Sequence, residues 1–203
     1  MPRMTENWIA LDTETTGFKP TDACVWSLAA VALLDGENIG EFDSLVRPEL
    51  EFFQRQHRDV VRNVSGLGDA QLLELLDAPP ASIVTGNFLT WLHDLAAART
   101  VRFTSYNVAF DRPFLDVGPL RIAEAVETRL CRSTTWADCV MERSKQAMGL
   151  PRWPKLPVAC AHFGIPFVES HQALADTRAA AALAIKLGMS TPVVTAPTLA
   201  LEF

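Results

Sequence analysis

The segment Trp8-Ile9-Ala10-Leu11-Asp12-Thr13-Glu14-Thr15-Thr16-Gly17 decides how the rest of this chain is interpreted. Its apolar first half predicts a strand that carries two acids near its end. Because side chains alternate between the faces of a strand, Asp12 and Glu14 are expected to share one face. Two carboxylates that close raise each other's pKa or need neutralisation, for which a hard divalent cation is the usual partner. The pair therefore indicates half of a metal site, although two ordinary surface acids at a strand end give the same pattern.

Length and composition predict one soluble domain. The chain has 203 residues, of which 49% are hydrophobic, enough to build a full core. The sequence does not begin with a basic segment followed by an apolar run, and the longest apolar stretch, residues 28–34, is too short to cross a bilayer. We therefore expect a cytoplasmic protein without membrane association, with one domain over residues 1–190 and a short C-terminal tail, 191–203. The 4 cysteines show no CxxC spacing and predict reduced thiols, not disulfides or a zinc site.

The net charge of −6 argues against a surface that coats long duplexes, because phosphate neutralisation requires an excess of Lys and Arg. Carboxylates that hold metal ions count as acidic in this sum, so a small nucleic-acid site stays open. An ordinary solvated surface is the default interpretation of each local basic group. These groups are Arg55, Arg58 and Arg62, then Arg129 and Arg132, and finally Arg152 and Lys155.

The order of the predicted elements favours an α/β fold. A buried strand at 24–34 and an Asp35-Gly36 turn that leads to a strand at 39–46 predict an antiparallel meander after the first strand. Strands first and helices afterwards, with a late strand feeding a helix, indicate a mixed sheet flanked by helices. The later elements are helices at 69–76 and 82–97, a strand at 101–105, a helix with Asp111 in its first turn, and helices at 137–148, 156–163 and 172–187.

Two further acids are expected on helix faces that turn toward the core. Asp176 lies on the apolar stripe of the last helix, with Ala180 and Leu183 following at helical spacing. Asp111 lies beside Phe110, on the face expected to return to the sheet. For either acid alone, a favourable charge at the start of a helix is the alternative.

Four carboxylates would meet if these elements converge, namely Asp12, Glu14, Asp111 and Asp176. Without cations such a group repels itself strongly. Two divalent ions roughly 3.5 to 4 Å apart would turn this repulsion into net attraction and provide the arrangement used for phosphoryl displacement. The sequence therefore predicts two Mg²⁺ ions as cofactors, for which Mn²⁺ can substitute.

Three short motifs carry these acids. They are Leu-Asp-Thr-Glu-Thr-Thr-Gly at 11–17, Asn-Val-Ala-Phe-Asp at 107–111 and His-Gln-Ala-Leu-Ala-Asp-Thr at 171–177. In order and spacing the motifs resemble those of the DEDDh, or DnaQ-like, 3′-to-5′ exonucleases of the ribonuclease H-like superfamily. The resemblance runs from Ile9 to about Leu187 and implies a ribonuclease H-like mixed β-sheet flanked by α-helices.

The resemblance also implies roles for the motif residues. A sister subfamily has Tyr four residues before the final Asp, whereas position 172 is Gln, so His171 is implied as the general base. Asp12 would bind both metals, Glu14 and Asp176 would complete one of them, and Asp111 would act directly or through water. The implied reaction is hydrolysis from the 3′ end of single-stranded nucleic acid, with DNA favoured and a proofreading or repair role, releasing nucleoside 5′-monophosphates.

Residues beside the acids are implied as substrate contacts. Thr15, Thr16, Gly17 and Phe18 would hold the 3′-terminal sugar and base, with stacking on the Phe ring. Asn107 belongs to the second motif, and Phe110 would either wedge against a base or pack in the core. Family members often carry His-Gly-Ile-Thr before the helix that precedes the second motif. The corresponding stretch here begins with Ser65, so a His contact to the terminal nucleotide is missing.

Other functions remain open from the sequence. A 3′-to-5′ exoribonuclease of ribonuclease T or oligoribonuclease type has the same motifs, because the choice between RNA and DNA depends on contacts to the 2′-hydroxyl. A non-catalytic nucleic-acid-binding module and a hydrolase of small phosphoesters are further alternatives. Loss of a metal ligand would mark the non-catalytic module, and all four acids are present. The expected partners are single-stranded 3′ ends, with a polymerase or replication complex and a homodimer as further candidates.

Overall fold

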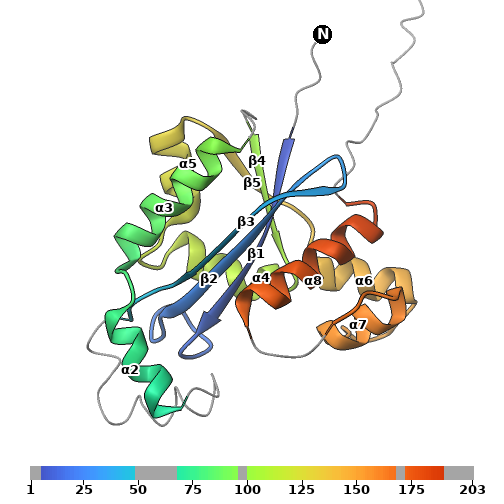
Figure 1. The fold of residues 1–203 in the computed structure, drawn as a ribbon. Helices are drawn as coiled ribbons and strands as arrows, with labels where there is room; N and C mark the ends of the chain where they lie inside the picture. Colours follow the sequence, from blue (N-terminus) through green and yellow to red (C-terminus); the bar gives the residue numbers. More distant parts are fainter. Residues whose placement is uncertain (1–5, 49–67, 96–99, 168–171, 190–203) are drawn as a thin grey trace, which may run out of the picture.

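A single mixed sheet forms the centre of the computed structural model, which describes residues 6–48, 68–95, 100–167 and 172–189 (Figure 1). The strand order is β3-β2-β1-β4-β5. β1 pairs antiparallel with β2 and parallel with β4, so the strand that carries the first motif lies in the middle. The predicted mixed sheet is confirmed. The strands are β1 (Glu6–Thr15), β2 (Val25–Leu34), β3 (Glu37–Leu45), β4 (Thr100–Ser105) and β5 (Ser133–Trp136).

The predicted turn between the second and third strands is confirmed. Asp35 and Gly36 connect β2 to β3 with φ angles of 51° and 84°. Two consecutive left-handed residues suit a two-residue hairpin, because their backbone twist matches that of the flanking strands. β2 is buried along almost its whole length, since it lies between two strands and both of its faces are covered.

Helices cover both faces of the sheet. Figure 1 shows α3 and α5 on one side and α6, α7 and α8 on the other. The alternation of β1 matches these two layers, because Leu11 packs with Phe88 of α3, while Ala10 packs with Leu183 of α8. In the described part of the chain, no helix is both long and apolar enough to traverse a lipid bilayer. The helices are α2 (Asp69–Asp77), α3 (Ala81–Asp94), α4 (Val108–Asp116), α5 (Ile122–Leu130), α6 (Val140–Met148), α7 (Leu156–Phe163) and α8 (Ala173–Lys186).

The structure contains two elements, α5 and β5, that are not predicted from the sequence. α5 is flanked by Arg121 and Cys131, both in the left-handed region, and neither end carries a typical capping residue. β5 has only four residues and pairs with β4 alone. Short elements with weak end signals are difficult to detect from local pattern, so the sheet has one more parallel strand than predicted.

Some helix ends differ from the predicted ones. α6 begins at Val140 rather than at Ala137, because the Ala137 amide donates to the Phe103 carbonyl at 2.7 Å and continues the pairing along β4. α3 ends at Asp94 rather than at residue 97, since the backbone of Leu95 is extended. The predicted tail, residues 191–203, lies outside the described residues.

Candidate metal-dependent active site

Three carboxylates lie together at the carboxyl end of the central strand. Asp12 and Glu14 come from β1, and Asp176 comes from the first turn of α8. One oxygen of each side chain lies within 4.8 Å of the others. The alternation of β1 therefore places its two acids on the face that α8 covers, as predicted. A set of converging carboxylate oxygens is the ligand type that Mg²⁺ and Mn²⁺ prefer.

Burial and mutual repulsion raise the pKa values of Asp12 and Glu14. Burial raises the pKa of Asp12 well above its usual value, and the charges of neighbouring acids, Asp111 first among them, raise it further. Burial and the charges of Asp176 and Asp111 raise the pKa of Glu14 to about 7. Ionisation of these two side chains is thus less favourable than ionisation of exposed acids, and a bound cation would offset that cost. The donor set fits a divalent cation, because bound positive charge would remove the repulsion that these shifts record.

Asp111 approaches this group from α4. Its Oδ1 accepts hydrogen bonds from the backbone amide of Thr13 at 3.1 Å and from the Thr13 hydroxyl at 2.8 Å. Burial raises the pKa of Asp111 to about 6, while hydrogen bonding by Ser105 and Thr13 opposes that increase. The oxygens of Asp111 are not part of the three-carboxylate group. The structure therefore brings three of the four predicted acids together and holds the fourth beside them.

The turn after β1 is held by its own hydroxyl groups. The Thr15 hydroxyl donates to the Gly17 carbonyl at 2.7 Å, and the Thr16 hydroxyl accepts from the Cys24 amide at 2.9 Å. Both threonines are buried, whereas Phe18 is 75% exposed. The threonine hydroxyls therefore shape the turn, and the Phe18 ring is the side chain of this segment that is open for stacking.

The second motif forms the start of α4. The Asn107 carbonyl accepts hydrogen bonds from the amides of Phe110 at 2.8 Å and Asp111 at 3.2 Å, while its side chain makes no cap bond. Phe110 is partly buried, packs against the core on the α3 side, and lies 5.4 Å from the Phe114 ring, centroid to centroid. Phe110 thus contacts the core while part of its side chain stays accessible, and its contact with a substrate base stays a prediction.

Two predicted features lie outside the described residues. One is His171, the expected general base. The other is Ser65, which stands where family members often have His. Gly68, at the end of the same stretch, precedes α2.

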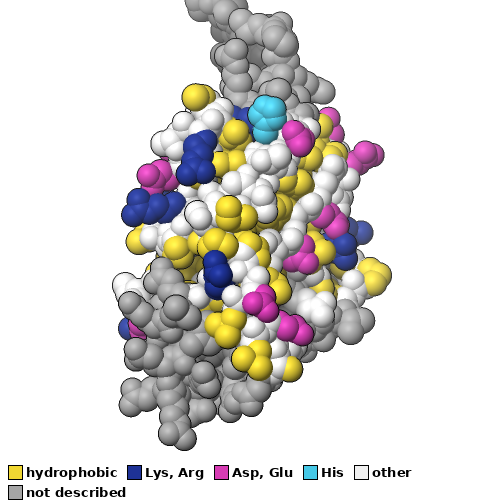
Figure 2. All heavy atoms as spheres, turned by 60° about the vertical axis from the view of Figure 1, so that its left-hand side comes forward, with side chains coloured by type: hydrophobic (Ala, Val, Ile, Leu, Met, Phe, Trp, Pro, Cys, Tyr) yellow, Lys and Arg dark blue, Asp and Glu magenta, His cyan; other side chains and the backbone are white. Residues whose placement is uncertain are grey.

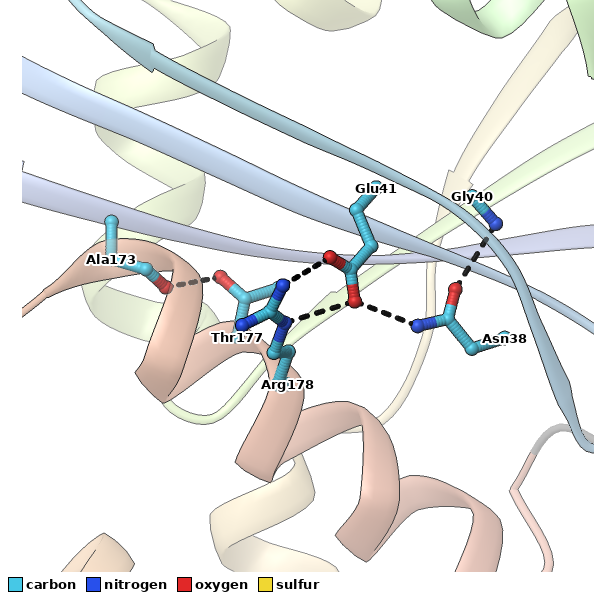
Figure 3. A network of polar contacts seen from close by, with 6 residues as sticks. All are labelled: Asn38, Gly40, Glu41, Ala173, Thr177 and Arg178. Carbon is cyan, nitrogen blue, oxygen red and sulfur yellow. Dashed lines mark hydrogen bonds and ion pairs between the residues drawn. The ribbon is translucent and has the colours of Figure 1, made fainter. Parts of the chain in front are cut away.

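One contact at the site is not predicted from the sequence. Arg178, two residues after Asp176, donates from Nε and Nη2 to the two carboxylate oxygens of Glu41 on β3, at 2.9 and 2.6 Å (Figure 3). Asn38 donates to the same carboxylate at 2.9 Å, and its own side-chain oxygen accepts from the Gly40 amide. This network ties the helix that supplies Asp176 to the edge of the sheet. No sequence signal indicates the pair, because its members are 137 residues apart.

Comparison with known proteins finds an exonuclease family model and relatives named as DNA polymerases. The RNase T exonuclease family model matches residues 9–184. The DNA polymerase III PolC-type of Staphylococcus saprophyticus is 26% identical over 183 residues, which make up 90% of this chain but 11% of that protein. The chain thus spans only a small part of the curated relatives that it matches.

Solved structures show the same fold. Exonuclease X in complex with 5′ overhanging duplex DNA superposes with a TM-score of 0.60 at 19% identity, covering 90% of this chain and 92% of that one. A 3′-exonuclease, in a structure of 3′-end specific recognition of a histone mRNA stem-loop, gives a TM-score of 0.65 at 17% identity, covering 90% of this chain and 63% of that one. Since the family model covers most of the chain, the protein belongs to the DnaQ-like exonuclease family of the ribonuclease H-like superfamily.

Proposed function

We propose that this protein is a metal-dependent 3′-to-5′ exonuclease that removes nucleotides from the 3′ end of single-stranded nucleic acid. The observation that carries the proposal is the group formed by Asp12, Glu14 and Asp176, whose oxygens lie within 4.8 Å of one another. Cleavage of the bond between phosphorus and the 3′ oxygen of the preceding nucleotide would release a nucleoside 5′-monophosphate.

The acidic residues would hold two Mg²⁺ or Mn²⁺ ions, with Asp111 acting directly or through water. When bound, such ions activate the attacking water and offset the negative charge on the leaving 3′ oxygen. His171, five positions before Asp176, would accept the proton of that water, because an imidazole titrates near neutral pH. Thr13 supports the proposed role of Asp111, since two hydrogen bonds orient one oxygen of that carboxylate.

The turn after β1 and the start of α4 would supply the substrate contacts. Phe18 would stack on the 3′-terminal base, a contact that tolerates any sequence and suits a degradative enzyme. The buried hydroxyls of Thr15 and Thr16 would hold the turn through Gly17 in shape for the terminal sugar. Asn107 would contribute to the same subsite from the start of α4.

Single-stranded DNA is the favoured substrate. The PolC-type relative is named a DNA polymerase, and Exonuclease X was solved with duplex DNA, which support this choice and a proofreading or repair role. An exoribonuclease is the second candidate, because another structure of the same fold recognises the 3′ end of a histone mRNA stem-loop. A polymerase partner and a cytoplasmic location remain part of the proposal.

Oligonucleotides labelled at the 5′ end test the proposal. Single-stranded DNA, duplex DNA with a mismatched 3′ end and RNA of the same sequence are incubated with Mg²⁺ or with EDTA. A shortening ladder that requires Mg²⁺ and is absent from an Asp12→Asn variant is the expected result. Faster shortening of RNA would favour the second candidate, and oligonucleotides that all stay intact would refute exonuclease activity.

A further inference from the structure

The α6–α7 hairpin concentrates positive charge in an acidic protein. Residues 140–163 contain four Lys or Arg side chains against one acid, a net charge of +3, whereas the whole chain has −6. The basic side chains are Arg143, Lys145, Arg152 and Lys155, and the acid is Glu142. The face on the α3 and α5 side of the sheet, turned forward in Figure 2, shows charges of both signs around hydrophobic side chains. The positive charge of the hairpin is therefore expected to attract polyanions.

The loop of this hairpin presents an aromatic ring to solvent. Trp153 is 63% exposed, and the other exposed large hydrophobic side chains among the described residues are aliphatic, apart from Phe18. The indole Nε1–H donates to the Glu142 carboxylate, and Lys145 Nζ lies 5.3 Å from the ring centroid. These contacts hold the ring in a defined orientation, which lowers the entropic cost of stacking another ring on it. Exposed Arg152 and Lys155 flank Trp153 in the sequence.

Two hydrogen bonds hold this loop near the carboxyl end of β4, which pairs with the strand that carries Asp12 and Glu14. The Tyr106 hydroxyl donates to the Pro154 carbonyl at 2.7 Å, and the Tyr106 carbonyl accepts from the Met141 amide, in the first turn of α6, at 2.9 Å. The parallel pairing of β1 with β4 ends at Leu11 opposite Ser105, and Asp12 and Tyr106 are the next residues of the two segments. The loop that bears Trp153 is thus anchored beside the proposed active site.

The second helix of the hairpin packs against α8, the helix that supplies Asp176. Leu156 and Cys160 of α7 belong to the same buried core cluster as Leu183 of α8. The hairpin is therefore fixed to an element that carries one of the three acids.

We propose that the α6–α7 hairpin binds the single strand on the 5′ side of the scissile bond, with one base stacked on Trp153 and phosphates paired with Arg152 and Lys155. This inference rests on the exonuclease function proposed above. A basic surface with an exposed, oriented indole suits a strand that offers phosphates and base faces in alternation. The backbone chemistry is shared by DNA and RNA, so both are tested.

Length dependence of hydrolysis provides the test. The ratio of kcat/KM for a 20-nucleotide strand to that for a dinucleotide is measured, because a dinucleotide has a single nucleotide on the 5′ side of the scissile bond, whereas the longer strand can extend along the hairpin. In Trp153→Ala this ratio is expected to fall roughly 5- to 150-fold, the worth of one stacked base. Trp153→Phe keeps an aromatic face and is expected to recover most of the loss. Matched DNA and RNA strands show which sugar the hairpin accepts.

Salt dependence tests the charges. The double variant Arg152→Gln/Lys155→Gln is expected to reduce the slope of log KM against log salt concentration by about 1.4, since each phosphate contact to a single strand contributes about 0.7. The matched control, Arg121→Gln/Arg129→Gln, removes two exposed charges from around α5, on the opposite face of the sheet, and is expected to leave the slope unchanged.

The failure of this inference can be separated from failure of the proposed function. If wild-type protein hydrolyses neither substrate, exonuclease activity fails, while fluorescence anisotropy with a labelled 20-nucleotide strand in EDTA still measures binding by the hairpin. Wild-type length ratio, salt slope and anisotropy in the Trp153→Ala and double variants would overturn the inference. Loss that Trp153→Phe does not recover would likewise reject stacking.

Discussion

Replacing Glu14 by Gln is expected to stabilise the metal-free protein while weakening its response to Mg²⁺. Glu14 is half-buried close to Asp176 and Asp111, and its pKa is raised from 4.5 to about 7. Gln has nearly the same shape without the charge, so the variant removes the repulsion and leaves the packing. The gain in stability and the loss of a metal ligand have the same cause.

The size and sign of the effect follow from the pKa shift. A displacement of this size means that ionised Glu14 destabilises the folded state by up to about 3 kcal/mol. Because the folded pKa lies above the unfolded one, the stability of the wild-type protein falls as pH rises from about 4.5 through 7. The difference between variant and wild type is therefore below about 1 kcal/mol at pH 5 and rises to at most about 3 kcal/mol at pH 8, because solvent screens part of the repulsion at this partly exposed group.

Urea unfolding in EDTA at pH 5 and pH 8 measures these free energies. Glu37→Gln, on the exposed surface of β3, is the matched control and is expected to behave as wild type. With Mg²⁺ at 100 times its dissociation constant, the wild-type protein should gain about 2.7 kcal/mol, and the Glu14→Gln variant less. Equal stabilities of variant and wild type at pH 8 in EDTA, or a larger difference at pH 5 than at pH 8, would refute the reasoning.

Three further experiments test other parts of the site. His171→Ala should retain Mg²⁺-dependent stabilisation but lose roughly 10²- to 10⁴-fold in turnover, and near wild-type turnover would exclude a general base at this position. Thr13→Val removes the hydroxyl that orients Asp111, so the Mg²⁺ concentration for half-maximal activity should rise roughly 10-fold or more, and an unchanged Mg²⁺ titration would contradict that role. Arg178→Ala, combined with Glu41→Ala in a double-mutant cycle, should give a coupling energy below about 1 kcal/mol in urea unfolding, because the pair is solvent-exposed. A coupling above about 2 kcal/mol would show that the tether is part of the cooperative fold.

Local chemistry is enough to predict the centre of this fold. Strand alternation places Asp12 and Glu14 on one face, and the left-handed preference of Asp35-Gly36 predicts the hairpin without tertiary information. Helical spacing likewise turns Asp176 toward the sheet. These features depend on neighbours in sequence, which is why they can be read from the chain alone.

The remaining features depend on contacts between distant residues. Thr13 and Asp111 are 98 residues apart, and nothing in either motif indicates that the residue between the two acids orients another acid. β5 forms by pairing with the outer side of β4. The hydrogen bond from the Ala137 amide to the Phe103 carbonyl continues this pairing, so α6 begins later than predicted. The ion pair between Arg178 and Glu41 forms only because α8 passes next to β3, and local periodicity does not predict that path.

The bond between Thr13 and Asp111 also affects how the sheet ends. The pairing of β4 with β1 stops at Ser105, opposite Leu11, so the amide of Thr13 finds no strand partner on that side. The Oδ1 atom of Asp111 takes the place of the missing carbonyl and prolongs the ladder by one rung. A side chain proposed for catalysis thus also accepts a hydrogen bond from a backbone amide that has no strand partner on that side. Asp111→Ala would therefore remove this hydrogen bond at the end of β1 as well as the proposed metal ligand. Asp111→Asn would keep an oxygen that can accept the bond and would remove only the charge.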